Sequence, residues 1–102
     1  MTIEFHTAYG KIAEKLIAEI RNEIMLLAHI NKSISRAEVF LKMDEAIITA
    51  DNKICEIRLL ILGDNLLARS RTENFEKSSK DALKKLKQLV TQQVKKHKEQ
   101  TD

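Results

Sequence analysis

The chain has 102 residues, of which 43% are hydrophobic and 32% are charged, and its formal net charge is +3. This length supports one domain around one core, and the apolar share is that of a globular protein rather than a disordered one. A single cysteine, Cys55, excludes an internal disulfide, and there is neither a secretory signal nor an apolar run of the roughly 20 residues that a membrane span needs. We therefore expect one cytoplasmic domain over residues 1–102.

The first thirty residues predict a strand followed by a helix. Residues 2–6 alternate polar and apolar side chains, which places Ile3 and Phe5 on one face of a short strand. Thr7 is a suitable cap for a helix that ends near residues 29–31. The apolar residues of this helix recur at three- and four-residue spacing, which predicts one buried stripe: Tyr9, Ile12, Ala13, Leu16, Ile20, Ile24 and Leu27.

Three further strands are predicted between residues 36 and 71. Residues 36–43 alternate again and form the second strand. Residues 44–52 fit either an extension of that strand or a turn, and both remain open. Residues 53–62 form the third strand, and the tight turn Gly63-Asp64-Asn65 leads into a fourth at residues 66–71.

A long final helix completes the predicted fold. Asn74 is a helix cap, and the helix runs from Phe75 to about Lys98. The resulting order is β-α-β-β-β-α. The first two strands are parallel across the first helix, and the last three form an antiparallel meander. We therefore predict an α+β, two-layer sandwich: a four-stranded mixed sheet with two helices on one face.

The positive charge of the chain is concentrated in this final helix. Residues 77–102 hold eight basic and three acidic side chains, whereas the first 76 residues hold ten and twelve. On a helical wheel with Ala82 at zero, the predicted core stripe contains Ser79, Leu86, Leu89 and Gln93. Six lysines lie at about 140–220° on the same wheel, with no carboxylate among them. They are Lys77, Lys80, Lys84, Lys87, Lys95 and Lys98.

A row of like charges has two readings. Rows of lysine are commonly a solvated face, but such faces usually mix both signs, because like charges one turn apart repel each other. We favour a partner-binding surface, and its natural partner is a polyanion that lysines contact through phosphates. Four basic residues on the open sheet face are expected to extend it: Arg69, Arg71, Lys42 and Arg36.

Several stretches of the chain resemble one protein family. Asn52-Lys53-Ile54-Cys55-Glu56-Ile57 looks like the third strand of the ribosome hibernation-promoting factors in their short, single-domain form. These proteins are also called ribosome-associated translation inhibitors or sigma-54 modulation proteins. Gly63-Asp64-Asn65-Leu66-Leu67-Ala68 is similar to their hairpin and fourth strand. Asn74-Phe75-Glu76 resembles the start of their last helix, with Ala82 and Leu86 at the family's core positions.

This resemblance implies a fold and a function. Members share the β-α-β-β-β-α fold, related to double-stranded-RNA-binding domains. They bind the small ribosomal subunit and its rRNA in the channel used by mRNA and tRNA, and thereby silence translation under stress. The chain departs from the family at three places. Glu76 and Lys80 stand where members often carry tyrosine and aspartate, Gln88 replaces a basic residue, and Ile24–Ala28 lacks the usual lysines.

No pattern in the sequence predicts catalysis, a metal site or a cofactor. His6, His29 and His97 are scattered, no carboxylate or cysteine stands near them at metal-ligand spacing, and no glycine-rich phosphate loop occurs. We therefore expect a protein that is not an enzyme. An alternative is a divergent member that acts as a protein–protein interaction module or homodimer through Ile24, Met25, Leu26 and Leu27. A simpler reading is that Met25 and Leu26 pack under the following loop.

Overall fold

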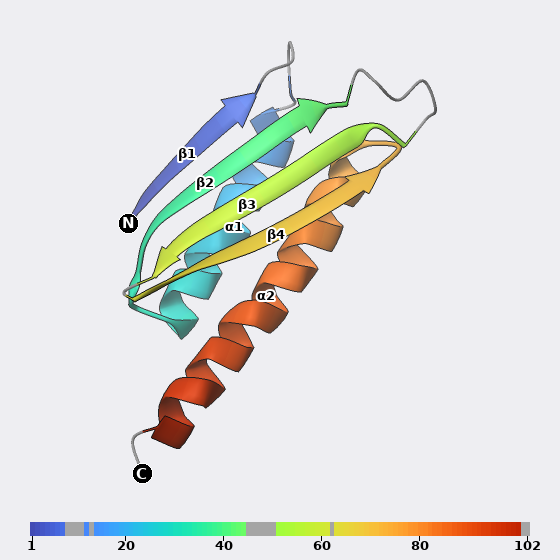
Figure 1. Cartoon of the computed structure of the whole chain (residues 1–102). Coiled ribbons are helices and arrows are strands. Elements are labelled where there is room, and N and C mark those ends of the chain that lie inside the picture. The colour runs from blue at the N-terminus through green and yellow to red at the C-terminus, as the bar shows by residue number, and fades with distance from the viewer. Residues whose placement is uncertain (8–11, 13, 45–50, 62, 101–102) are drawn as a thin grey trace.

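Four strands and two helices follow one another in the predicted β-α-β-β-β-α order (Figure 1). The structure, a computed structural model, describes residues 1–7, 12, 14–44, 51–61 and 63–100, with side chains as far as residue 93. Tyr9, Ala13 and the ambiguous residues 45–50 lie outside these ranges. The elements are β1 (Thr2–Thr7), α1 (Glu14–Ile30), β2 (Ile34–Met43), β3 (Lys53–Ile61), β4 (Asp64–Thr72) and α2 (Phe75–Gln100).

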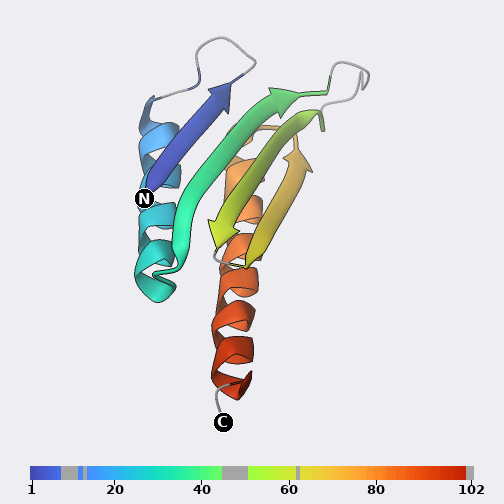
Figure 2. The same ribbon diagram turned by 60° about the vertical axis from the view of Figure 1, so that its left-hand side comes forward.

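The sheet has the order β1-β2-β3-β4, and both helices cover the same face of it (Figures 1 and 2). The strand β1 pairs with β2 in parallel, and the two other pairs are antiparallel. The predicted α+β two-layer sandwich is therefore confirmed. No helix of the described residues lies on the opposite face of the sheet, and the C-terminal part of α2 extends past the end of the sheet.

The turn between β3 and β4 is shorter than the sequence predicts. Ile61 pairs with Asp64, so β4 begins directly after Gly63, and Asn65 already belongs to the strand. Gly63 has a φ of 84°, a left-handed conformation typical of two-residue hairpin turns. Asp64 and Asn65 are common turn residues, but they are exposed here at the start of a strand, where their side chains meet solvent.

The core lies between the sheet and the two helices. Alternation along the strands turns Val39, Ile57 and Ala68 toward the helices, as predicted. The buried residues of α1 follow the predicted stripe: Leu16, Ile20, Ile24 and Leu27. In α2 the predicted stripe is rotated, because Val90 is buried while Leu89 and Gln93 are only partly buried. The physical reason is that α2 packs against α1 as well as against the sheet, which draws its buried stripe toward the neighbouring helix.

Candidate nucleic-acid interface

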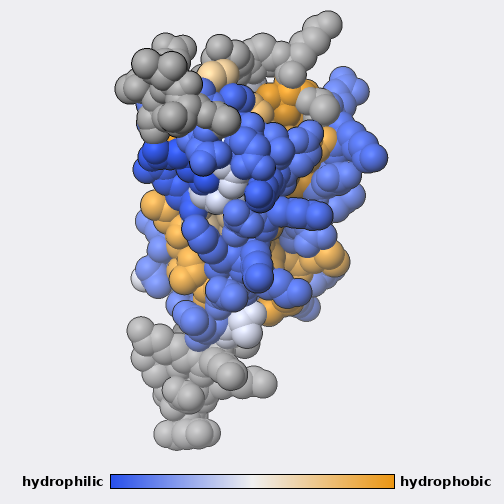
Figure 3. Space-filling model, turned by 90° about the vertical axis from the view of Figure 1, so that its right-hand side faces the viewer, coloured by the Kyte–Doolittle hydropathy of each residue, from blue (hydrophilic) through white to orange (hydrophobic). Residues whose placement is uncertain are grey.

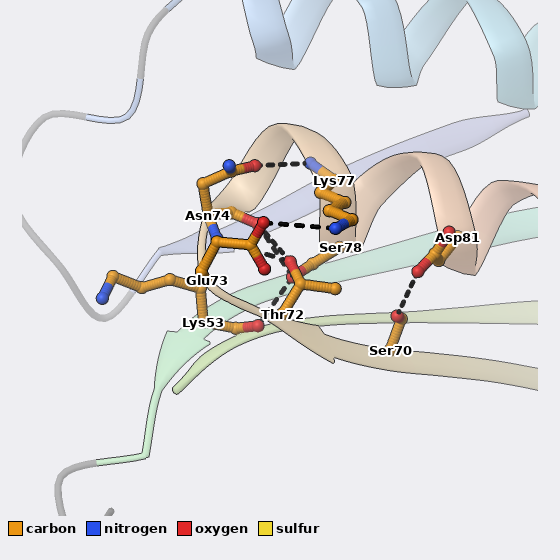
Figure 4. Close-up of polar contacts among 8 residues, drawn as sticks. All are labelled: Lys53, Ser70, Thr72, Glu73, Asn74, Lys77, Ser78 and Asp81. Carbon is orange, nitrogen blue, oxygen red and sulfur yellow. Dashed lines mark hydrogen bonds and ion pairs between the residues drawn. The ribbon is translucent and has the colours of Figure 1, made fainter. Parts of the chain in front are cut away.

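The start of α2 is fixed to the sheet by a compact set of hydrogen bonds (Figure 4). Asn74 caps the helix as predicted, because its Oδ1 accepts a 2.8 Å bond from the backbone N–H of Lys77. The hydroxyl of Ser78, which is fully buried, donates to the carbonyl of Lys53 at 2.6 Å and lies 2.7 Å from Thr72 Oγ1. These contacts hold the first turn of α2, and with it Lys77, in a set orientation against β3 and β4.

Two further contacts hold α2 against β4. Ser70 Oγ donates to Asp81 Oδ2 at 3.4 Å, and Lys85 Nζ donates to the backbone carbonyl of Arg69 at 3.0 Å. Lys85 therefore lies on the β4 side of the helix and is not part of the predicted lysine row. The surface on this side of the molecule is mostly hydrophilic (Figure 3).

The lysine row lines one wall of a groove between α1 and α2. The groove has a volume of about 800 Å³ and an apolar floor that includes Leu16, Ile20 and Leu83. Its α2 wall carries the first four lysines of the predicted row, all of which are exposed: Lys77, Lys80, Lys84 and Lys87. The side chains of the last two predicted members, Lys95 and Lys98, lie outside the described residues.

The opposite wall of the groove, formed by α1, is acidic. A helical wheel of α2 alone does not show this, because it contains no residue of α1. Glu19 and Glu23 of α1 are exposed and line the groove across from the lysines. Within the described part of the chain, no ion pair joins either of them to a lysine. Two charged walls of opposite sign thus face each other across an apolar floor.

Three of the four described lysines of the row carry no carboxylate partner among the described residues. Lys77 alone is paired, with Glu73 at 3.2 Å. The pKa of the Glu73 carboxyl is lowered by a hydrogen bond that it accepts from its own backbone N–H and by the contact with Lys77. Lys80, Lys84 and Lys87 are exposed and form no ion pair with any described residue. These three ammonium groups are therefore available to an external anion.

The predicted basic residues of the sheet form a separate surface. Alternation turns Arg69 and Arg71 of β4 away from the helices, and both are exposed. Arg36 and Lys42 of β2 lie on the same open face. The expectation that these four residues extend the lysine row is therefore wrong, because the sheet itself separates the two surfaces.

Carboxylates on the open face already neutralise part of its positive charge. Arg36 contacts Glu4 at 2.7 Å and Glu38 at 3.9 Å, and Lys42 lies 3.9 Å from Glu56. Among the described residues, Arg69 and Arg71 have no such ion pair. The two arginines of β4 are thus the part of this face that is best suited to binding an anion.

Strand pairing brings together a histidine and two glutamates that the sequence does not show as a group. Glu4 lies opposite Glu38, and His6 lies two residues further along the same face of β1. His6 Nε2 is 3.6 Å from Glu4 and 3.3 Å from Glu38, and the three ligand atoms lie within 4.8 Å of one another, a spacing at which a metal ion can be held. Arg36 contacts both carboxylates and supplies a positive charge there.

Cys55 is the only thiol of the chain, and it is buried in the core. Burial raises the pKa of the Cys55 thiol to about 11. The thiol is therefore protonated at neutral pH, which agrees with its predicted place as a small core residue and not with a nucleophile.

The apolar residues in the C-terminal part of α1 are partly exposed to solvent and partly buried in the core. Met25 and Leu26 are 45% and 57% exposed, so they do not pack under the following loop. Ile24 and Leu27 are core residues with 0% and 4% exposure, so the prediction that they form a contact surface is wrong. Ile30 is 48% exposed and joins the accessible set. The wheel spacing of α1 explains this division, because residues 24 and 27 lie on the sheet side of the helix.

Two solved structures have folds similar to this one. The structure resembles that of a ribosomal subunit interface protein from Coxiella burnetii, with a TM-score of 0.78, 14% identity and coverage of 92% of this chain and 98% of that one. It also resembles the N-terminal domain of Thermus thermophilus Protein Y, with a TM-score of 0.68, 12% identity and coverage of 89% and 93%. A comparison with curated protein sequences gave no match.

The two-layer fold is thus that of ribosomal subunit interface proteins. The chain belongs to the family described as Sigma 54 modulation protein / S30EA ribosomal protein, whose pattern matches residues 3–102. This is a family of ribosome-associated proteins, which confirms the predicted resemblance. Within the described residues, no helix has the length and apolar character needed to cross a membrane.

Proposed function

We propose that the chain is a non-enzymatic protein that binds the small ribosomal subunit in the channel for mRNA and tRNA and inhibits translation under stress. The observation that carries this proposal is the α2 wall of the groove, where Lys80, Lys84 and Lys87 are exposed without carboxylate partners among the described residues. Membership of a ribosome-associated family supports the ribosome as the target. A ribosome-bound protein of this kind acts in the cytoplasm.

The mechanism rests on phosphate contacts rather than on reading bases. Each lysine ammonium neutralises a backbone phosphate and releases a counterion, which fixes position and gives affinity without sequence preference. The helix α2 is rigidly held at its start by Asn74 and Ser78, so its lysines are presented at a fixed spacing. A protein held in this way in the channel inhibits translation by excluding mRNA and tRNA. No bond is made or broken.

Salt dependence tests this mechanism directly. If the four groove lysines, with Lys77 included, contact one phosphate each, the logarithm of the binding constant falls against the logarithm of salt with a slope of about −3. Binding should then be roughly 60-fold weaker at 200 mM than at 50 mM. The measurement is sedimentation of the chain with purified small subunits at both concentrations. Binding that is indifferent to salt, or absent at the lower concentration, contradicts the proposal.

A second candidate function is a protein–protein interaction module that does not bind ribosomes. The observation in its favour is the half-exposed apolar set Met25, Leu26 and Ile30. Three such side chains are far fewer than the roughly 20–30 residues per side of a stable interface. This candidate predicts that the chain stays in the supernatant in the sedimentation experiment and forms a concentration-dependent dimer.

A further inference from the structure

A row of four side chains runs along α1, and its first two members line the groove across from the lysines of α2. Glu19, Glu23, Leu26 and Ile30 are spaced by four, three and four residues, which places them within about 60° of one another on the helix. All four are exposed. We call these four residues the α1 row. Its first half is acidic and its second half is apolar, with Leu26 and Ile30 57% and 48% exposed.

The charge of the α1 row is unsuited to an RNA backbone. Phosphates that bind Lys80 and Lys84 come close to Glu19 and Glu23, because both walls line the same groove. Neither carboxylate has an ion-pair partner among the described residues. Repulsion between carboxylate and phosphate acts over about 8 Å at physiological salt. A bound partner must therefore bring a positive charge to this wall.

The apolar half of the α1 row indicates that this partner also carries apolar groups. A hydrated cation compensates Glu19 and Glu23, but it offers nothing to Leu26 and Ile30, which are 57% and 48% exposed. A polypeptide that carries lysine or arginine beside apolar side chains satisfies both halves at once. A second copy of this chain is a poorer match, because the accessible apolar area is small for a stable dimer.

We propose that the α1 row docks a basic polypeptide segment of the small subunit, with apolar side chains, beside the phosphates that α2 holds. This inference rests on the proposed function and names a second component of the same interface. The two helices then contact different components of the small subunit. The lysines of α2 contact rRNA, and the acidic and apolar row of α1 contacts protein, so the chain is seated where the two meet.

Charge reversal on α1 gives opposite results for the two kinds of partner. Glu23→Lys changes the net charge of the α1 row by +2, because an ammonium group replaces a carboxylate, and Glu14→Lys makes the same change at an exposed position of α1 outside the row. If Glu23 faces a basic polypeptide, Glu23→Lys weakens binding to purified small subunits about tenfold, while Glu14→Lys changes it less than about twofold. If the row faces rRNA alone, Glu23→Lys strengthens binding, and the inference is overturned.

Photo-crosslinking identifies the neighbour directly. A photoreactive amino acid is placed at Leu26 or at Lys84, both exposed, and each variant is irradiated on purified small subunits. We expect crosslinks to ribosomal protein from position 26 and to rRNA from position 84. Crosslinks from position 26 to rRNA, to a second copy of the chain, or to nothing contradict the inference.

Sedimentation of the unmodified chain distinguishes failure of the proposed function from failure of this inference alone. If the unmodified chain does not sediment with small subunits at low salt, the proposed function fails, and the inference fails with it. If it does sediment, but Glu23→Lys binds more tightly or position 26 crosslinks only to RNA, the proposed function stands and the inference alone is wrong.

Discussion

Removing the Ser78 hydroxyl tests whether the start of α2 is held as described. The hydroxyl is fully buried, and it lies 2.6 Å from Lys53 O, 2.7 Å from Thr72 Oγ1 and 3.0 Å from Asn74 O (Figure 4). In Ser78→Ala the carbonyl of Lys53 loses this donor and the buried hydroxyl of Thr72 loses its partner, which costs about 1–3 kcal/mol. Alanine regains up to about 0.5 kcal/mol through its better helix propensity. We expect a net loss of about 2 kcal/mol in the free energy of unfolding.

The loss is large enough to measure in two ways. In a domain of this size it corresponds to a fall of roughly 10 °C in the melting temperature. Urea denaturation followed by circular dichroism should show a lower midpoint with an unchanged slope. The matched control is Ser35→Ala, whose exposed hydroxyl donates to Leu60 O at 3.3 Å and whose loss should cost less than about 0.5 kcal/mol. A Ser78→Ala variant as stable as this control would refute the reasoning.

Three further predictions concern other parts of the structure. Asn74→Ala removes the cap on the Lys77 N–H, and urea denaturation should show a loss of about 1 kcal/mol, whereas no loss would mean that another group caps α2. Burial raises the pKa of Cys55 from 9.0 to about 11, so the folded state keeps a proton that the unfolded chain releases. Stability should therefore fall between pH 9 and 11 by roughly 2–3 kcal/mol, and Cys55→Ala should lack this part of the fall. Leu26→Asp should leave the free energy of unfolding within about 0.5 kcal/mol of the unsubstituted chain, because Leu26 is exposed, and a larger loss would mean that Leu26 is packed.

Periodicity was sufficient to predict the elements and their order. The alternation around Val39 and Ile57, and the helical spacing of Leu16, Ile20 and Ile24, depend only on which face of an element is buried. Turn boundaries were less predictable, because Asp64 and Asn65 fit a turn as well as the exposed start of a strand. The rotation of the buried stripe toward Val90 depends on the packing of α2 beside α1, which no single-helix wheel contains.

The candidate site was predictable only in part. The wheel of one helix was enough to find Lys80, Lys84 and Lys87 on one side of α2. It did not show that Glu19 and Glu23 face them, because that requires the relative placement of two helices. The register between strands could not be predicted from the sequence either. The sequence therefore did not show that carboxylates of neighbouring strands pair with Arg36 and Lys42 on the open face.

The central claim is that the lysines of α2 hold the chain on rRNA, and a matched charge reversal tests it most directly. The double variant Lys80→Glu and Lys84→Glu is compared with Lys15→Glu and Lys32→Glu, which makes the same change in net charge at exposed sites outside the groove. The measurement is the dissociation constant for purified small subunits at one salt concentration. We predict at least about tenfold weaker binding, or roughly 1.4 kcal/mol, for the first variant and less than about twofold for the second. Equal losses in both variants, or none in the first, would contradict the account.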